Sequence, residues 1–509
     1  MLSRILSELS KTHAHIIGST GAGKSKLIEA ILGEALKQGK SFCLIDWHGT
    51  LYRDILKMLS VLRPKRNIYL LNPNESEHIT GFNPFVRPDS EPSAAVSRLI
   101  DATVKPWGAT STDDTPQLAQ VLRLVFTYAV ERGETLPNVS HLLDASRQGL
   151  RKAAASQIKD AYMRRQWEEF AGVSDTKFRD LVASSVRRLD RFLAPVGVRR
   201  MLGLKEGNLN LREIVEAGGI LLVNLSASDY LPPESAKLLA ALLLAEFLEI
   251  GLSHAKNPVK YVLALDEFQE YITHDVASML DQVRKGGLHL LLAHHRLAQL
   301  ARDEELNDAI ATQARLKIVF GGLRYEAASD IALEISLSDI NKRKIKDVFE
   351  HQVTQHELIS IASETRTQSE TFSAEDDELR MTTGRSDLSS WMLLPIYGRE
   401  VSSITDYTLD ERTNFATEQL MNLKQRQCFL KFPSESAALR WTVPSVREYR
   451  VYDSKLRDYE VAIYEKQGAR SSEDVDRMME EDAQRFLNAT IPARKKKPST
   501  PPPSGPPRI

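Results

Sequence analysis

Two regions of the chain, residues 13–90 and 216–335, consist of short continuous apolar runs separated by segments whose apolar residues have helical spacing. Within residues 13–90, the runs at 41–46 and 67–71 predict buried strands, and residues 51–62 between them have helical apolar spacing. The pattern returns near residue 216, with strand-like runs and one long helix at 219–225, 233–251, 259–266, 288–293 and 316–320. Strands that alternate with helices are typical of a mostly parallel α/β sheet.

Other patterns fill the rest of the chain. Amphipathic segments such as 118–130 and 178–193 predict an all-helical insertion. The polar stretch 363–387, rich in Ser, Thr and acidic residues, predicts a loop or flexible flap. It is followed by strand candidates at 428–432 and 439–443 and a charged helix at 454–487. The basic, proline-rich end cannot form a core and is expected to be disordered.

We therefore expect an α/β fold with an inserted all-helical domain and a C-terminal extension. The core is expected in two parts, at 1–92 and 216–362, on either side of the helical domain at 93–215. A loop with small strands follows at 363–450, then the charged helix at 451–493 and the disordered tail at 494–509.

Composition limits the class of protein. The 509 residues carry a net charge of -1, with 42% hydrophobic and 27% charged residues, which is ordinary for a globular protein. Any nucleic-acid-binding surface must therefore be local. Cys43 and Cys428 lie in apolar runs, as expected for buried thiols in a reducing compartment. No run approaches the 18 apolar residues of a membrane span, so we expect a cytoplasmic protein without a span of its own.

Residues 18–25 form a complete phosphate-binding loop between a predicted strand and a predicted helix. In such loops backbone N–H groups surround phosphates, the lysine reaches the β- and γ-phosphates, and the final hydroxyl ligates Mg²⁺. We therefore expect ATP and Mg²⁺ as cofactors. The expected binding residues are Gly18, Ser19, Thr20, Gly21, Ala22, Gly23, Lys24 and Ser25.

Two acids end the predicted strand at 261–265. Asp266 is expected to hold Mg²⁺, and Glu267 to orient or deprotonate the attacking water. Asp46 ends an earlier strand and could contact Mg²⁺-bound water, although a turn acid before glycine is an alternative.

The strand at 288–293 is followed by His294 and His295. A polar side chain there could sense the γ-phosphate, which makes His295 a candidate. Metal binding by these adjacent histidines is not expected, because neighbouring side chains on a strand point in opposite directions. Arg284 could reach a neighbouring subunit's γ-phosphate, with Arg324 as the second choice. Stabilisation of a helix C-terminus is the alternative for Arg284.

Six motifs together resemble the HerA/FtsK superfamily of DNA-pumping ATPases. They are the phosphate loop, Asp-Trp-His-Gly at 46–49, Phe-Asn-Pro at 82–84, Leu-Asp-Glu-Phe at 265–268, Arg-Lys-Gly-Gly at 284–287 and Ala-His-His-Arg at 293–296. In particular, residues 13–335 are similar to the cytoplasmic ATPase domain of conjugative type IV secretion coupling proteins (TraD/TraG-like) and DUF87-type relatives. The resemblance implies a RecA-like P-loop NTPase core.

This sequence departs from the family at two points. His295 stands where the family usually has Gln, and because the loop starts at residue 18, we expect the family's N-terminal part to be absent. We therefore expect that a membrane-anchored or secretion-channel partner recruits the protein to the membrane, or that it works free in the cytosol.

The resemblance implies a hexameric, ATP-driven DNA translocase. Residues 147–205 carry 14 Lys and Arg against 6 Asp and Glu, which agrees with contact to a polynucleotide. A secretion ATPase that moves or remodels protein, and a nucleotide-gated defence module, are the alternatives. Stimulation of ATPase activity by DNA would distinguish them.

Overall fold

The computed structural model describes residues 1–86, 91–104, 106, 115–271, 274–295, 304–340, 345–372 and 379–489. These residues belong to two compact units, one formed by 1–335 and 417–509 and the other by 336–416. The predicted tail at 494–509 lies outside the described residues.

The first unit is built on a nine-stranded sheet with the order β12-β11-β8-β1-β7-β6-β2-β5-β3. The seven strands from β8 to β3 are parallel, and β11 and β12 add an antiparallel edge. The strands are β1 (Ala14–Ile17), β2 (Ser41–Asp46), β3 (Ile68–Leu71), β5 (Ile220–Asn224), β6 (Tyr261–Leu265), β7 (Leu288–His294), β8 (Leu316–Phe320), β11 (Gln427–Lys431) and β12 (Leu439–Thr442). The expected mostly parallel α/β sheet is confirmed.

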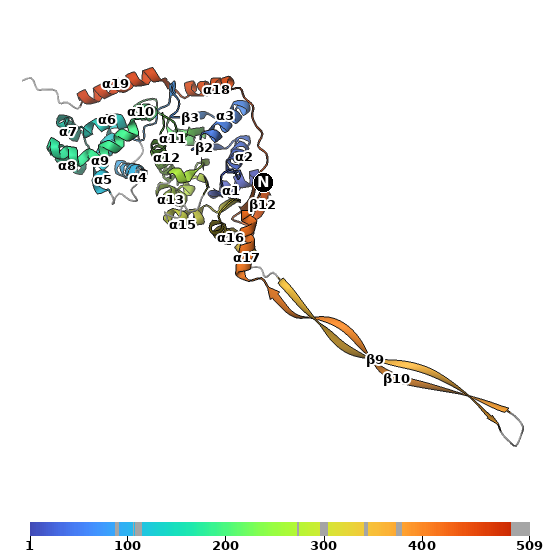
Figure 1. Cartoon of the computed structure of the whole chain (residues 1–509). Coiled ribbons are helices and arrows are strands. Elements are labelled where there is room, and N and C mark those ends of the chain that lie inside the picture. Colours follow the sequence, from blue (N-terminus) through green and yellow to red (C-terminus); the bar gives the residue numbers. More distant parts are fainter. Residues whose placement is uncertain are drawn as a thin grey trace, which may run out of the picture. The chain divides into compact units, whose positions relative to one another are not determined.

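Each face of this sheet has its own core, because successive side chains of a buried strand point to opposite faces. On β2, Leu44 belongs to one cluster, with the helices α1 (Leu2–Leu9), α2 (Lys24–Lys37) and α3 (Thr50–Leu62). Cys43 and Ile45 belong to the other, with α12 (Pro233–Ser253) and α13 (His274–Gln282). Figure 1 shows these two groups of helices on opposite sides of the strands.

The described residues from 92 to 216 form helices and turns. The helices are α4 (Pro92–Val104), α5 (Pro116–Arg132), α6 (Leu136–Ser140), η3 (His141–Leu143), α7 (Gln148–Ala155), α8 (Ala161–Gly172), α9 (Asp175–Leu193), α10 (Val196–Leu202) and α11 (Leu211–Glu216). Their apolar residues, among them Trp167 and Phe178, are continuous with the core that contains α12. The helical region is therefore packed onto one face of the sheet.

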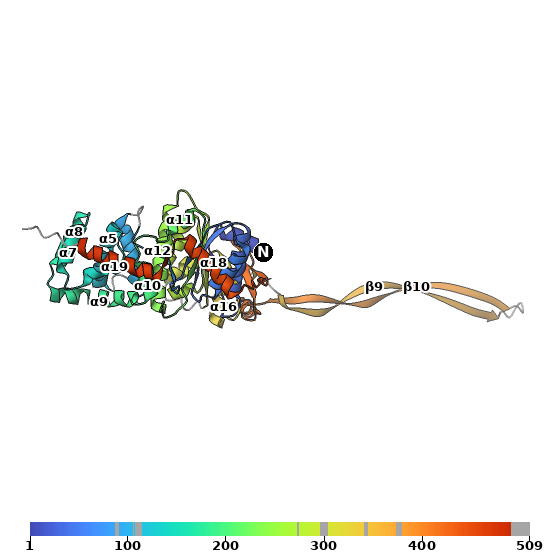
Figure 2. The same ribbon diagram turned by 90° about the horizontal axis from the view of Figure 1, so that it is seen from above.

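Further elements connect or follow the strands. They are η4 (Phe268–Tyr271), η5 (Val283–Gly286), α15 (Glu304–Gln313), α16 (Tyr325–Ile340), α17 (Leu409–Met421), α18 (Asp453–Lys466) and α19 (Ser472–Ala489), with β4 (His78–Ile79) paired to β13 (Arg470–Ser471). The helix predicted at 454–487 is thus two helices, interrupted at Gly468, which has a φ of 81°. Figures 1 and 2 show α19 along the helical region and α18 beside α3.

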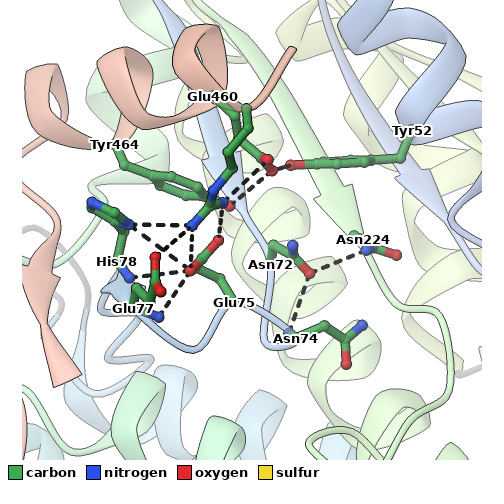
Figure 3. A network of polar contacts seen from close by, with 10 residues as sticks. Tyr52, Asn72, Asn74, Glu75, Glu77, His78, Asn224, Glu460 and Tyr464 are labelled. Atoms are coloured by element: carbon green, nitrogen blue, oxygen red, sulfur yellow. Dashed lines mark hydrogen bonds and ion pairs between the residues drawn. The ribbon is translucent and has the colours of Figure 1, made fainter. Parts of the chain in front are cut away.

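A polar network fastens α18 to the sheet (Figure 3). The Arg457 guanidinium binds both carboxylate oxygens of Glu75, at 2.5 and 3.0 Å, and contacts Glu460 at 3.3 Å. The Tyr52 hydroxyl of α3 donates to Glu460 at 3.3 Å. Glu75, Glu77 and His78 are close enough to hold a metal ion, but Arg457 contacts all three, so we assign this cluster a structural role.

The second unit contains a long antiparallel ribbon made of β9 (Ile345–Phe372) and β10 (Leu379–Asp406), whose strands coil about each other in Figures 1 and 2. The loop prediction for 363–387 is wrong for its described residues, which lie in these two strands. Threonines suit extended backbone, and Arg385 forms an ion pair with Glu364 across the strands. Composition suggested a loop because these strands lack apolar alternation.

Among the helices that the structure describes, none combines the length and the apolar character that a membrane crossing requires.

Candidate nucleotide and metal site

Apart from Arg284, the residues singled out by sequence lie at the carboxyl edge of the parallel strands. Ile17, which precedes the phosphate loop, pairs with His294 at the end of β7. Ile45 pairs with Leu265, so Asp46 and Asp266 follow at the same level of β2 and β6. Ligands of open parallel sheets bind beyond the carboxyl ends of the strands, which makes this edge the candidate site.

Glycines allow the phosphate loop to turn from β1 into α2. Gly21 and Gly23 have φ angles of 77° and 117°, which other residues rarely adopt. A side chain at Gly18 would place its Cβ 2.4 Å from the Phe320 Cβ. Ser19 is held from β8, because its N–H and hydroxyl donate to the Gly321 carbonyl at 3.2 and 3.1 Å. The loop is therefore fixed between two strands.

The C-terminal part of the chain also supports the phosphate loop. The Gln425 side chain donates to the Gly21 carbonyl at 3.1 Å, and the Arg426 N–H donates to the Ala22 carbonyl at 2.8 Å. Arg426 has a φ of 67°, and its guanidinium donates to the Val443 carbonyl at 2.7 Å. Sequence reasoning missed these residues, since they lie about 400 positions from the loop and belong to no motif.

Lys24 begins α2, and its buried amine is directed into the site. The Nζ donates to the carbonyls of Gly18 and Ser19, at 2.8 and 3.2 Å, and lies 2.5 Å from the His295 Nδ1. Burial lowers the pKa of Lys24, although Glu267 and Asp266 act in the opposite direction. These hydrogen-bond partners of the amine are neutral. An anion bound at this position would replace them, because charge-assisted hydrogen bonds are stronger.

Asp266 has a buried carboxylate whose surroundings favour binding of a cation. Its side chain is 2% exposed, and its Oδ1 has no hydrogen-bond partner among the described residues. Burial, with the charges of Asp46 and Glu267, raises the pKa of Asp266 to about 7. A divalent cation would satisfy this oxygen and favour its ionised form. The donors present therefore fit Mg²⁺, with the half-buried Ser25 in the first turn of α2 as the second predicted ligand.

Glu267 is held by His295. The His295 Nε2 lies 2.5 Å from the Glu267 Oε1, while Gln269 donates to Oε2 at 2.6 Å. Burial raises the pKa of Glu267, but these hydrogen bonds outweigh it, so the pKa lies below its usual value. Glu267 also has a φ of 50°, a conformation that non-glycine residues rarely adopt. One imidazole therefore joins the lysine to the glutamate.

Asp46 and His294 have mainly structural contacts. The Asp46 carboxylate accepts the His48 and Tyr52 N–H groups, at 3.0 and 2.7 Å, near the start of α3. His294 is fully buried and stacks on His15, with their Nε2 atoms 2.6 Å apart. The adjacent histidines thus face different neighbours.

The two arginines lie at opposite edges of the sheet. Arg284 is exposed in η5, which precedes β7, so it lies at the amino edge, away from the phosphate loop. Arg324 is exposed four residues after β8, on the side of the loop. A role of Arg284 in a neighbouring subunit stays a prediction. Arg296 lies outside the described residues.

Comparisons with known proteins agree with this fold. Residues 5–191 match the family model of the central domain of helicase HerA (DUF87). The unbound monoclinic form of the bacterial conjugative coupling protein TrwBdeltaN70 is 16% identical, and the match covers 87% of each chain with a TM-score of 0.52. TrwB in complex with ADP and Mg²⁺ is 15% identical, with 87% of each chain covered and a TM-score of 0.53.

The chain has a HerA/FtsK-type P-loop ATPase fold. The resemblance predicted from the sequence motifs is therefore confirmed, and it extends beyond residue 335, because the alignment with TrwB covers 87% of this chain. No curated protein sequence matches the chain.

Proposed function

We propose that this HerA/FtsK-type protein is an ATPase that moves DNA, and that it works as a ring, expected to be a hexamer, with nucleotide bound between subunits. One observation carries the ATPase proposal: Lys24, His295 and Glu267 form a continuous chain of contacts beside the unpartnered carboxylate oxygen of Asp266. These groups match the needs of a triphosphate, a water nucleophile and a divalent cation.

Each residue receives one role in this proposal. Residues Gly18–Ser25 bind the phosphates through backbone N–H groups, and Lys24 leaves His295 to contact the β- and γ-phosphates. Asp266 and Ser25 hold Mg²⁺, which neutralises charge on the phosphate oxygens when bound. Glu267 orients the water and accepts its proton, while His295 positions the glutamate.

DNA as the cargo is supported by the family of the matching model, a helicase domain, and by the conjugative role named for TrwB. The surplus of Lys and Arg at 147–205 supports it independently. We further expect a cytoplasmic location, with recruitment to the inner face of the membrane by a partner protein.

Substitution of Lys24 and Glu267 should separate binding from hydrolysis. Lys24→Ala removes a phosphate contact, so ATP binding should weaken strongly. Glu267→Gln retains the shape but not the base, so it should bind ATP and hydrolyse it at least about 10²-fold more slowly. Fluorescent-nucleotide binding and phosphate release measure the two effects. Lys26→Ala, which removes an exposed lysine two residues away, is the matched control. Wild-type turnover by Glu267→Gln would exclude the proposed base.

Arg284 can be tested as a residue that acts between subunits. We expect Arg284→Ala to lower turnover by about 10³-fold or more, as for other arginines that complete a neighbouring site. Mixing it with Lys24→Ala subunits should partly restore hydrolysis, because some interfaces regain an intact site. Lys285→Ala is the control. Turnover of Arg284→Ala within a few-fold of wild type would transfer the role to Arg324.

DNA-dependent hydrolysis tests the cargo. The proposal expects many-fold stimulation of ATPase activity that falls steeply with salt. Hydrolysis that is indifferent to DNA would favour the protein-moving or nucleotide-gated alternatives.

A further inference from the structure

A cavity of about 380 Å³ lies between the helical region and the start of α12, away from the phosphate loop. The described residues that surround it include Arg188, Arg191, Phe192, Glu234, Ser235 and Lys237. Three of these side chains are cationic and one is anionic. The cavity is therefore positively charged, and it lies where α9 meets α12.

The cationic groups are partly fixed in place. Arg188 is half-buried, and its guanidinium donates to the Ser184 hydroxyl one turn earlier at 2.6 Å. Arg191, on the next turn, forms an ion pair with Glu234 at 2.7 Å. Arginines one turn apart on a helix present their planar N–H groups to the same side, which suits the oxygens of a phosphate.

The start of α12 adds neutral donors and a partial positive charge. Its first residue, Pro233, has no N–H, and no side chain caps the helix. Ser235 in the first turn is only 4% exposed, and it lines the cavity, where its hydroxyl can donate a hydrogen bond to a bound anion. An uncapped helix N-terminus attracts anions.

We propose that this cavity binds a phosphate group of the nucleic-acid backbone, held by Arg188, Lys237, the Ser235 hydroxyl and the start of α12. The proposal rests on the DNA motor proposed above and names one contact that such a motor would use. The shared chemistry is a phosphate dianion or diester, so free phosphate is the competing source. Arg187, the exposed neighbour of Arg188, does not line the cavity.

The cavity also has a physical connection to Glu267. The Lys237 Nζ lies 3.5 Å from the Glu270 Oε2, in η4. The Glu270 N–H donates to the Glu267 carbonyl at 2.9 Å, so η4 begins directly after the residue with the unusual φ angle. A phosphate that attracts Lys237 competes with Glu270 for the ammonium. Occupancy of the cavity therefore changes the turn that holds Glu267, and this links DNA binding to hydrolysis.

Binding of a fluorescent single-stranded or duplex oligonucleotide to the full chain, measured against salt concentration, tests the contact. The double variant Arg188→Gln with Lys237→Gln should bind at least about tenfold more weakly, and the slope of log affinity against log salt should fall by about 0.7–0.9. Arg187→Gln removes one exposed positive charge next to Arg188 on α9, outside the cavity, and should weaken binding less than threefold. Equal effects of both variants would overturn the proposal.

Glu234→Gln provides a test of opposite sign. Removing this carboxylate deletes a repulsive charge and releases Arg191, so the oligonucleotide should bind several-fold more tightly, which misfolding cannot produce. DNA stimulation of ATPase activity should fall in the double variant and be kept in Arg187→Gln. Weaker or unchanged binding by Glu234→Gln would contradict the proposed site.

Inorganic phosphate distinguishes the two sources. The proposal expects it to compete with the oligonucleotide only weakly. If the wild type binds inorganic phosphate but no oligonucleotide, and the double variant binds neither, the cavity is a free-phosphate site and the nucleic-acid assignment fails. If wild type and double variant bind the oligonucleotide alike, the cavity assignment fails while the DNA motor stands.

Discussion

The carboxyl edge of the nine-stranded sheet and the β9–β10 ribbon use β-structure in opposite ways. The sheet is covered on both faces, and its edge holds Lys24, Asp266 and Glu267 at low exposure. The ribbon has two strands of 28 residues, and its described side chains are almost all exposed, with Trp391 at 66%. Leu358 and its neighbour Ile359 are both exposed, so apolar side chains lie on both faces.

The two regions are therefore stabilised in different ways. In the sheet, burial on both faces fixes the backbone, and the site can hold ionisable groups at shifted pKa values. In the ribbon, cross-strand hydrogen bonds and neighbouring pairs such as Leu358 and Leu393 define the structure. We therefore expect that adding or removing a single side-chain atom lowers the stability of the sheet strongly and that of the ribbon very little.

Glycine substitution gives the largest expected contrast. Gly287 has a φ of 82°, and a Cβ there would lie 1.6 Å from the Val259 carbonyl oxygen. Gly287→Ala should lower the free energy of unfolding by about 3 kcal/mol or more, measured by urea denaturation. At Gly384 of the ribbon, an added Cβ would lie 3.6 Å from its nearest neighbouring atom. Gly384→Ala should therefore change the free energy of unfolding by less than about 0.5 kcal/mol. Similar losses at both positions would refute the contrast.

Asp266 gives an intermediate effect with a defined pH dependence. Its folded-state pKa of about 7 exceeds the ordinary value of 3.8, so the folded state binds an extra proton between these values. Stability is therefore lost as pH rises from about 4 through 7. Without Mg²⁺ and nucleotide, Asp266→Asn should have a larger free energy of unfolding than wild type at pH 8, by an amount on the order of a few kcal/mol in urea denaturation. The difference should shrink towards pH 5.

The exposed Asp229 supplies the control for this measurement, since Asp229→Asn should leave the pH dependence unchanged. Addition of Mg²⁺ and nucleotide should stabilise wild type more than Asp266→Asn, because the cation needs the ionised carboxylate. A variant less stable than wild type at pH 8 would mean that Asp266 is not strained by its surroundings.

Removal of the ribbon is expected to have the smallest effect. All candidate site residues belong to the unit formed by residues 1–335 and 417–509. Replacing residues 345–406 with a short Gly-Ser linker should therefore shift the melting temperature of that unit by less than about 2 °C. Scanning calorimetry and nucleotide binding measure the outcome. A large loss of either would show that the ribbon is needed for the stability of the sheet.

The sequence could indicate where most candidate site residues lie in the fold because each signal is local, while their roles stay predictions. The phosphate loop, Asp266 with Glu267, and His295 each directly follow a strand that an apolar run predicts, and parallel strands bring their carboxyl ends together. Gln425 and Arg426 were not predictable, since their contacts with the loop depend on the antiparallel strand β11. The ribbon was missed because Ser and Thr favour loops and strands alike.

The position of the phosphate loop has a consequence for synthesis of the chain on the ribosome. Residues 18–25 leave the ribosome long before the segments that support them, because β1 lies between β7 and β8 and the partners of the loop are at residues 321 and 425–426. Contacts at such long sequence separation form slowly. The nascent chain must therefore carry an unsupported loop until residue 426 has been synthesised, and nucleotide capture should come only after that point.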